Sequence, residues 1–368
     1  MDDNKISNVN PNIVTNVIQK IEGKFGKMSN TRGKEHEFIG MNLKFTDDRK
    51  VKVSMKKHVL KAINSFHDDI TRDASTPATS YLFGVRESSP HLSEEKADNF
   101  HSVVAMLLFI SRRCRLDIQT AVGFLTTRVS APDQDDWNKL KRVLQYLRGT
   151  IDLVLTLGAD DLLSMFAWVD VSYGVHSDCK SHTGGAVSWG WGLTMCKKQK
   201  LNTKSSTEGE IVGVSDFMPN IIWARMFLEA QGEVLKKNTL YQDNQSAMKI
   251  ILNGRRSSGQ KTKHINNRYF WIKDRSENIK VEYCPTEKMI TDFFTKRLQG
   301  NLFRKFRDVV MGYKHISSLY DQSEQTSVQE RVEKKKKGIL SENINRPNVC
   351  ASEGLRRDVT WADVVRSN

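Results

Sequence analysis

Hydrophobic and polar positions alternate along residues 37–55 and then repeat at helical spacing up to about residue 147. The alternation is interrupted by a polar run at residues 46–50, which predicts a β-hairpin with its turn at Asp47 and Asp48. The apolar positions that follow recur every three or four residues, which predicts amphipathic helices. These helices are expected at residues 55–66, 97–112, 117–128 and 133–147. This half of the chain is predicted to be mainly helical with one small sheet.

The pattern changes near residue 158 to short apolar runs typical of buried strands. Strands are expected at residues 162–172, 184–190, 193–198, 239–243 and 279–285, and helices after residue 207 and at residues 244–252, 263–275 and 287–298. The resulting order β-β-β-α-β-α-α-β-α predicts an α/β (α+β) fold, in which helices flank a mixed five-stranded sheet.

Polar segments enclose these two parts. Residues 1–34 are rich in Asn, Lys and Gly, with one amphipathic turn, and are interpreted as the remnant of an upstream region. Residues 314–368 form a basic tail that includes four consecutive lysines, Lys334 to Lys337, and is predicted to be disordered from about residue 322. The predicted organisation is therefore 1–34, 35–158, 159–313 and 314–368.

Charge and cysteine usage narrow the class of protein. The net charge of +14 and the pI near 9.5 indicate a polyanionic partner. No apolar run approaches 18 residues and the N-terminus lacks a signal-peptide core, so neither a membrane partner nor secretion is expected. The five cysteines are scattered without C-x-x-C spacing, which predicts reduced thiols inside the cell.

Four acidic residues stand at predicted strand ends or near helix starts. They are Asp170, Glu210, Asp243 and Asp292. Two divalent ions can hold the attacking and leaving oxygens of a phosphodiester only where carboxylates from distant segments converge. The spacing of these acids therefore predicts a two-metal nuclease site of the ribonuclease H type.

Each acid also has an ordinary structural interpretation. Asp170 could be a solvated acid at the end of a strand, and Asp243 could cap the helix that follows it. Glu210 fits a capping box with Thr207, in which case Glu208 could take the role of metal ligand. Asp292 lies beside apolar residues of a predicted helix, where an unpaired acid is unusual.

Several blocks carry a family resemblance. Residues 200–210, which end in S-S-T-E-G-E, resemble the S-S-T-E-A-E segment of copia-type LTR retrotransposon Pol polyproteins. Residues 240–247, 263–265 and 289–296 resemble further blocks of the ribonuclease H domain of that family. Residues 76–78, 115–118 and 147–150 resemble the thumb and connection of its reverse transcriptase. The resemblance covers residues 35–313.

The resemblance implies hydrolysis of the RNA strand of RNA:DNA hybrids with two Mg²⁺ or Mn²⁺ ions. Asp170 would bridge both ions, Glu210 and Asp243 would hold the ion facing the leaving oxygen, and Asp292 the ion that activates water. The family often has A-D-A-D-W where this chain has Val169, Asp170, Val171, Ser172 and Tyr173, so only the first acid is present. A catalytically inactive, nucleic-acid-binding remnant of a truncated retroelement is the alternative.

Polymerase activity is not expected from this chain. The run Phe45, Thr46, Asp47, Asp48 resembles a reverse-transcriptase catalytic turn, but it falls in the predicted hairpin and no palm segment precedes it. The chain is interpreted as a fragment that begins after the polymerase active site.

Contacts to the hybrid are predicted in two places. Lys180, Ser181 and Thr183 lie in a turn between strands, and Lys263, His264 and Arg268 lie in a basic segment interleaved with aromatic residues. A solvated basic helix, or packing by His264, is the structural alternative for the second group. Other Pol or Gag products are candidate partners, and the expected locations are the cytoplasm, in virus-like particles, and the nucleus.

Overall fold

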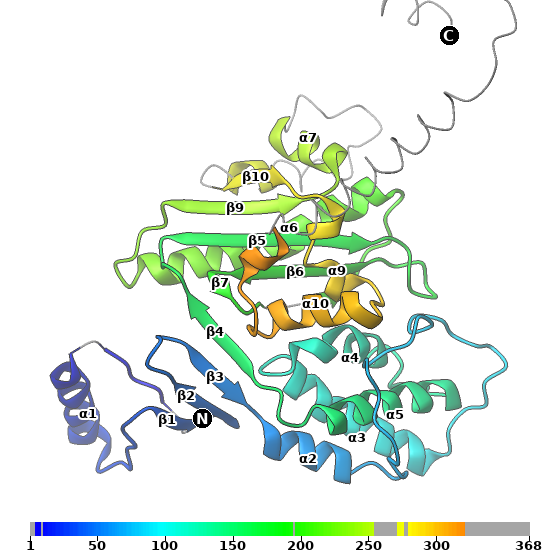
Figure 1. Cartoon of the computed structure of the whole chain (residues 1–368), viewed down its shortest axis with the longest axis horizontal. Helices are drawn as coiled ribbons and strands as arrows, with labels where there is room; N and C mark the ends of the chain where they lie inside the picture. The colour runs from blue at the N-terminus through cyan, green and yellow to red at the C-terminus, as the bar shows by residue number, and fades with distance from the viewer. Residues whose placement is uncertain (1–3, 9, 194–195, 254–270, 276–278, 321–368) are drawn as a thin grey trace, which may run out of the picture. The chain divides into compact units, whose positions relative to one another are not determined.

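The computed structural model describes residues 4–8, 10–193, 196–253, 271–275 and 279–320. Residues 4–320 fall within one compact unit that contains two five-stranded sheets. Figure 1 shows the helices of the first half, α2 to α5, grouped together below the second sheet.

The first sheet is antiparallel and contains the predicted hairpin. Its strands are β1 (Glu35–Phe38), β2 (Met41–Phe45), β3 (Val51–Ser54), β4 (Leu155–Ala159) and β7 (Gly190–Trp191), in that order. Phe45 pairs with Val51 across the turn, and Arg49 takes a positive φ of 59° that closes it. Asp47 and Asp48 are therefore exposed turn residues, as predicted.

The predicted helices of the first half are present with shifted ends. They are α2 (Lys56–Asn64), α3 (Glu94–Ser111), α4 (Gln119–Leu125) after the 3-10 turn η1 (Leu116–Ile118), and α5 (Gln134–Gly149), preceded in the chain by α1 (Pro11–Phe25). Helix α5 begins at a capping box in which Asp133 accepts from the backbone of Asp136 and Asp136 accepts in return. This local signal fixes the start of the helix close to the predicted residue.

The second sheet is mixed and has the order β10-β9-β5-β6-β8. Its strands are β5 (Ser164–Ser172), β6 (His182–Ser188), β8 (Cys196–Lys198), β9 (Lys237–Gln242) and β10 (Lys280–Tyr283). Central β5 runs antiparallel to β6 and parallel to β9, which is reached through the long helix α6 (Ser206–Glu229). The predicted ribonuclease H-like mixed sheet is confirmed.

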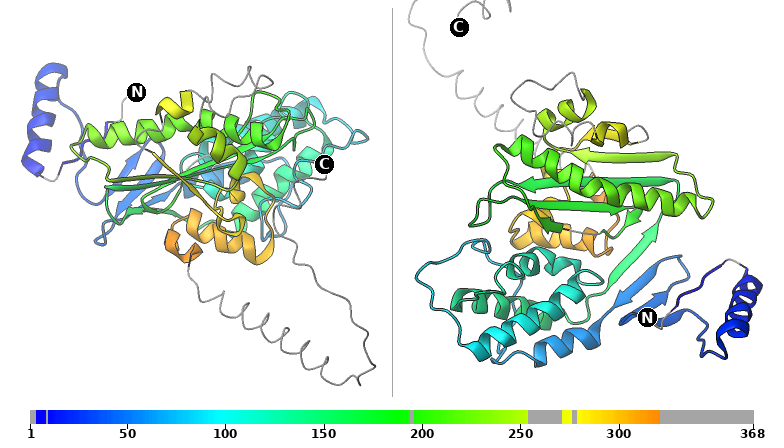
Figure 2. Two further views of the ribbon diagram at one scale, coloured as in Figure 1. Left: turned by 90° about the horizontal axis from the view of Figure 1, so that it is seen from above. Right: turned by 180° about the vertical axis from the view of Figure 1, so that it is seen from behind.

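Alternate residues of β5 face two different cores. Met165, Ala167 and Val169 pack with α6, whereas Phe166 and Trp168 face the core shared with the first-half helices. Figure 2 shows α6 lying across the back of the sheet. Among the described helices, α6 is the one with the length and apolar composition to cross a membrane, and its buried residues pack on this sheet.

The opposite face of the sheet is covered by short elements that the sequence pattern did not predict well. The helix expected at residues 287–298 is replaced by the 3-10 turn η4 (Thr286–Lys288) and the four-residue α9 (Asp292–Thr295). Helix α10 (Gly300–Val310) and the 3-10 turn η5 (Ile316–Leu319) follow, although no element was predicted there. Helix α7 (Gln245–Asn253) lies close to the expected range.

One hydrophobic core joins the two predicted halves of the chain. Phe293 and Phe303 pack in the same cluster as Leu107, Leu144 and Trp168. The predicted boundary near residue 158 falls within β4, which pairs with β3 on one side and β7 on the other. The division into segments stays a prediction, and the tail expected to be disordered lies, from residue 321 on, outside the described residues.

Candidate active site

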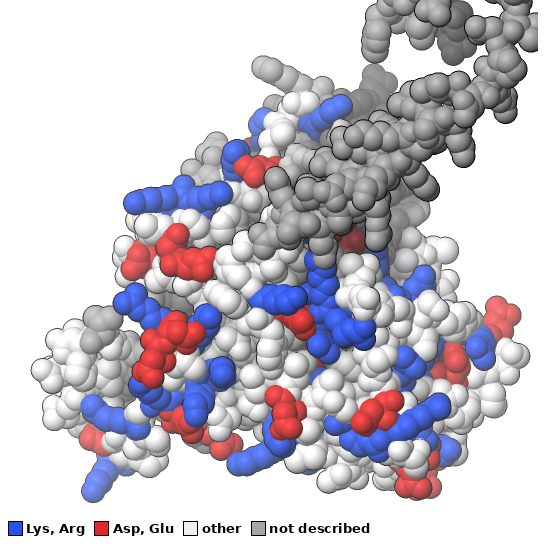
Figure 3. Space-filling view, viewed as in Figure 1, with Lys and Arg blue, Asp and Glu red and all other residues white. Residues whose placement is uncertain are grey.

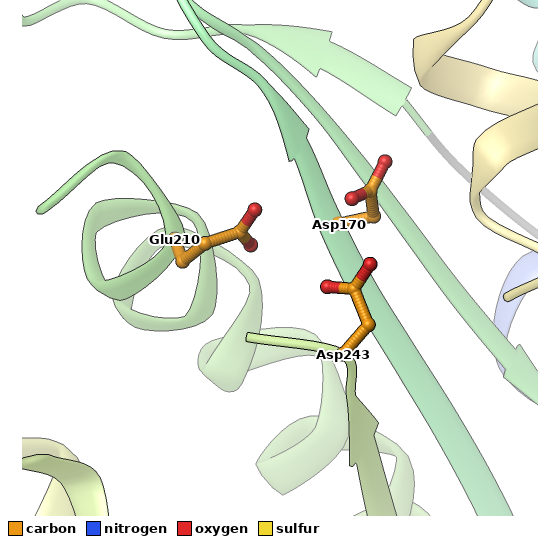
Figure 4. A group of neighbouring side chains, drawn as sticks. All are labelled: Asp170, Glu210 and Asp243. Carbon is orange, nitrogen blue, oxygen red and sulfur yellow. The ribbon is translucent and has the colours of Figure 1, made fainter. Parts of the chain in front are cut away.

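Three acidic side chains from separate elements meet at one end of the second sheet. Asp170 is on β5, Glu210 is in the first turns of α6, and Asp243 directly follows β9. One carboxylate oxygen from each lies within 4.8 Å of those from the other two. Figure 4 shows the three carboxylates pointing toward one another.

The topology explains this convergence. Strands β5 and β9 are parallel neighbours, and Trp168 lies opposite Tyr241. Asp170 and Asp243 each come two positions later in the chain, so both lie at the same edge of the sheet. Helix α6 also begins at that edge. Residues 40 and 33 positions apart in sequence are thus brought together by one strand pairing and one crossover helix.

The capping interpretation of Glu210 is wrong. The N-cap of α6 is Ser205, whose Oγ accepts from the backbone of Glu208 at 3.2 Å, and Glu208 accepts from the backbone of Lys204 at 2.7 Å. Glu210 is buried one half-turn further along. One of its oxygens accepts from the Val171 amide at 3.3 Å and the other from the Gln242 side chain at 3.2 Å.

The capping interpretation of Asp243 is also wrong. The side chain of Asn244 accepts from the backbone of Ala247 at 3.0 Å and so satisfies the start of α7. The carboxylate of Asp243 accepts from the Thr286 hydroxyl at 3.3 Å. It is half-buried and remains directed toward the other two acids.

Asp292 is the first residue of α9 and stands beside the three-acid group. Lys296, one turn later, lies 2.6 Å from its Oδ1, so the fourth acid has a resident counter-charge. From the same turn, the Thr295 hydroxyl donates to Asp170, and it therefore holds the central carboxylate in place. The four predicted acids share one neighbourhood, but only three meet closely enough to share one ion in the described structure.

Burial and repulsion disfavour the charged form of these acids. The pKa of Glu210 is raised well above its usual value by burial first and then by Asp170 and Asp243. Burial and Asp170 also raise the pKa of Asp243, and they raise that of Asp292 to about 7. Clustered carboxylate oxygens are hard ligands, so the cluster fits a divalent cation such as Mg²⁺ or Mn²⁺.

The free energy of unfolding of the metal-free protein should fall as the pH rises from 5 to 8. Acids with raised pKa values bind more protons when folded than when unfolded, so deprotonation between about pH 4 and 7 removes stability. The shift at Asp292, from 3.8 to about 7, contributes roughly 2–3 kcal/mol to this change between pH 5 and pH 8. Urea unfolding in EDTA at both pH values measures this. Asp292→Asn should make the unfolding free energy less dependent on pH. An equal pH dependence in the original protein and the variant would contradict a raised pKa at Asp292.

The predicted nucleic-acid contacts are placed differently from the acids. Ser181 is buried and accepts from the Gly174 amide, and Thr183 is buried and accepts from Gln199, so neither hydroxyl is offered to a ligand. Lys180 is half-exposed and lies 3.0 Å from Asp178. The other three predicted contacts, Lys263, His264 and Arg268, lie outside the described residues.

Sequence reasoning missed the residues that hold the acids in place. Gln242 is fully buried and binds Glu210, while its own oxygen accepts from the backbone of Asp243 at 2.8 Å and of Asn244 at 3.0 Å. Its position at the end of a buried strand, directly before an acid, was an available signal. Lys296, spaced four residues from Asp292, was another.

The strand order defines a ribonuclease H-like fold, and the acids at one sheet edge form a candidate metal site. In sequence, the chain is 29% identical over 311 residues to the retrovirus-related Pol polyprotein from transposon TNT 1-94 of Nicotiana tabacum, a match that covers 80% of this chain and 23% of the relative. It is 26% identical over 288 residues to that from transposon RE2 of Arabidopsis thaliana, covering 74% and 19%. The predicted resemblance to copia-type retrotransposon Pol polyproteins is confirmed.

The chain spans about a fifth of the length of these polyproteins. No family model matches it. Among solved structures, the foamy viral protease-reverse transcriptase in complex with RNA/DNA hybrid aligns with a TM-score of 0.39 and 11% identity, covering 77% of this chain and 34% of the other.

Proposed function

We propose that this protein is a ribonuclease H that hydrolyses the RNA strand of RNA:DNA hybrids. The convergence of Asp170, Glu210 and Asp243 carries the proposal, because two buried acids and one half-buried acid at one edge are costly unless a cation binds there. The relationship to Pol polyproteins supports a retroelement origin. The net charge of +14 suits a nucleic-acid substrate.

Asp170, Glu210 and Asp243 would hold the divalent ions, with Asp292 contributing from the side. Bound ions would activate a water molecule and stabilise the leaving oxygen of the phosphodiester. The rest of the site positions the ligands. Thr295 fixes the rotamer of Asp170, and the Gln242 amide and the Val171 backbone orient the two oxygens of Glu210.

Lys296 places a positive charge beside the acids before any ion binds. Its contact with Asp292 lowers the repulsion within the cluster, and its pKa is raised by that contact although burial opposes the shift. Asp292, with a pKa near 7, can hold a proton at its carboxylate around neutral pH in the metal-free protein. The site can therefore fold without metal and release this proton when a cation binds.

Glu210→Gln and Glu208→Gln form a matched pair that tests the site. Glu210→Gln should lower the rate of RNA cleavage at least about a hundredfold, since an amide is a poor metal ligand. It should not lower the melting temperature in EDTA, because it removes a buried charge that Asp170 and Asp243 repel. Glu208→Gln makes the same chemical change two residues away, at a partly exposed capping position, and should leave cleavage unchanged.

Cleavage of a labelled hybrid and thermal unfolding of both variants decide the assignment. Full activity in Glu210→Gln would remove this residue from the metal site. Loss of activity in Glu208→Gln alone would transfer the role to Glu208.

A further inference from the structure

A cavity of about 480 Å³ is lined by the second half of α6 and by the first sheet. Its volume falls within the range of roughly 300–1,000 Å³ that is typical of ligand sites. None of the acids of the candidate active site lines it. Trp223 of the cavity follows Glu210 on α6 by 13 residues, which corresponds to about 20 Å along the helix axis. The cavity is therefore separate from the acid cluster.

Two aromatic rings of α6 line this cavity and are exposed to solvent. Trp223 and Phe227 are one helical turn apart, and their side chains are 66% and 52% exposed. The two rings stack at a centroid distance of 5.3 Å and an interplanar angle of 16°. Large apolar groups gathered at the surface mark binding sites. A flat, unsaturated ligand could extend this stack.

The first sheet contributes a ring and a fixed cation to the cavity. The Lys50 ammonium lies 3.5 Å from the centroid of the Trp191 ring. Gly158 makes room for this contact, since a Cβ at that position would lie only 2.9 Å from Cγ of Lys50. Lys50 also pairs with Asp48 at 3.2 Å, so its ammonium is held between the ring and the turn of the hairpin.

Arg49 adds a positive charge that no described acid neutralises. The residue is exposed and lines the same cavity, and it forms no ion pair among the described residues. Its φ of 59° lies in the left-handed region, which glycine adopts at lower cost than arginine. The hairpin thus carries an arginine at a position where the backbone favours glycine.

The charges of the cavity favour an anionic ligand. Its described lining contains Arg49 and Lys50 and no carboxylate. Elsewhere on the first sheet, cations lie beside acids, as Lys44 does beside Glu35 at 2.6 Å. Figure 3 shows this mixture of blue and red side chains over β2 and β3. The cavity therefore combines exposed rings with an excess of positive charge.

We propose that this cavity binds an unpaired nucleobase of a single-stranded nucleic acid together with the adjoining phosphate. The base would stack on Trp223 and Phe227, and the phosphate would contact Arg49. Every base has a π-face, so stacking of this kind requires no particular sequence. The bases of a duplex already stack on one another and are not free to enter. The inference goes beyond the proposed ribonuclease, because it uses none of the active-site acids.

Anisotropy of a fluorescein-labelled oligodeoxythymidylate, measured with the full chain in EDTA, tests the stacking contact. Trp223→Ala should weaken binding about tenfold, since it removes the larger ring. Trp223→Phe keeps an aromatic ring and should bind more tightly than Trp223→Ala. Phe25→Ala is the control, because Phe25 is 74% exposed on α1 and does not line the cavity. It should bind like the original protein.

The salt dependence of the same binding tests the phosphate contact. Arg49→Asn should reduce the slope of log affinity against log salt by about one. Its melting temperature should not fall, because asparagine tolerates a positive φ. Lys44→Gln removes a charge that Glu35 already neutralises and should leave the slope unchanged. An unchanged slope in Arg49→Asn would overturn the phosphate contact.

An oligonucleotide with a single 2-aminopurine reports stacking directly, since the fluorescence of this base falls when it stacks on a ring. The fluorescence should fall when the original protein binds and fall less with saturating Trp223→Ala. A loss of structure alone would not produce this difference at saturation. Oligouridylate in the same assay distinguishes RNA from DNA as the source of the base. Binding of either strand that depends on Trp223 supports the site, and binding of neither overturns it.

Three other outcomes would overturn the proposal. Equal affinity of Trp223→Ala and the original protein for both single strands would remove the stacking contact. Equal weakening for a blunt-ended RNA:DNA hybrid would show that the site does not require an unpaired base. A dimer that dissociates in Trp223→Ala, with oligonucleotide affinity unchanged, would assign the cavity to a second copy of the chain.

The experiment is independent of the proposed ribonuclease. Binding is measured without metal, so Trp223-dependent binding in a protein that cuts no RNA would support the cavity and contradict the nuclease. Hybrid cleavage in a protein that binds neither single strand would support the nuclease and overturn the cavity.

Discussion

Asp170→Asn should lower the rate of hybrid cleavage by several orders of magnitude. Asp170 is buried on the central strand and interacts with the other three acids, since its charge raises the pKa of Glu210, Asp243 and Asp292. Replacing it with a neutral amide would remove a metal ligand and the associated stabilisation of the transition state.

The same substitution should leave folding intact. Asparagine has the same shape, and its side-chain oxygen can still accept from the Thr295 hydroxyl. Asp161→Asn, which changes an exposed acid before the other end of β5, is the control and should retain full activity. Single-turnover cleavage with saturating protein, together with thermal unfolding, measures both effects. Near-normal cleavage by Asp170→Asn would contradict the metal site.

Of the substitutions considered, Asp117→Asn should cause the largest loss of unfolding free energy. Asp117 and Arg115 are both buried, and two guanidinium nitrogens contact the carboxylate at 2.9 and 2.7 Å. The Tyr146 hydroxyl also donates to Asp117 at 2.6 Å, and Arg115 donates to the Thr150 carbonyl at 2.9 Å. Neutralising Asp117 would leave the arginine charge buried without its partner, which costs about 3–5 kcal/mol.

Asp73→Asn is the matched control for this effect. Asp73 also pairs with an arginine, Arg148, at 2.7 Å, but its side chain is 57% exposed. Water screens such a pair, so its loss should cost less than about 1 kcal/mol. Urea unfolding curves for the two variants give the comparison. Similar small losses in both would show that the buried network is not a major source of stability.

The order of elements was predictable because each strand and helix of the second sheet has its own local signal. An apolar run marked β5, and good capping residues marked the start of α6. The exact cap was not predictable, since Ser205, Ser206 and Thr207 are all favourable N-caps. Only the packing of Glu210 against Val171 and Gln242 distinguishes the ligand from the capping residue.

The elements after β10 show a second limit of pattern reading. Met289, Ile290, Phe293 and Phe294 are all buried, so they appear as one helical stripe, although the first two lie in the loop after η4 and only the last two lie in α9. Helix α10 had a clear stripe at Phe303, Phe306 and Val310 that was overlooked.

Positions that depend on distant partners were not accessible from sequence. Nothing near Arg142 in the chain indicates that its guanidinium would donate to the hydroxyl of Thr76, which is 66 residues away in sequence. Thr295 and Gln242 likewise acquire their roles only when β5, α6 and α9 come together. Local patterns therefore predicted the acids, whereas the contacts that orient them emerged from the fold.

Cleavage of an end-labelled RNA:DNA hybrid during titration with Mg²⁺ tests the central claim most directly. The protein should cut the RNA strand, leave the DNA strand intact, and lose this activity in excess EDTA. Mn²⁺ should also support cleavage, because the cluster offers carboxylate oxygens to either ion. RNA cleavage that persists in excess EDTA, or no cleavage with either ion although the hybrid is bound, would contradict the proposed two-metal ribonuclease H.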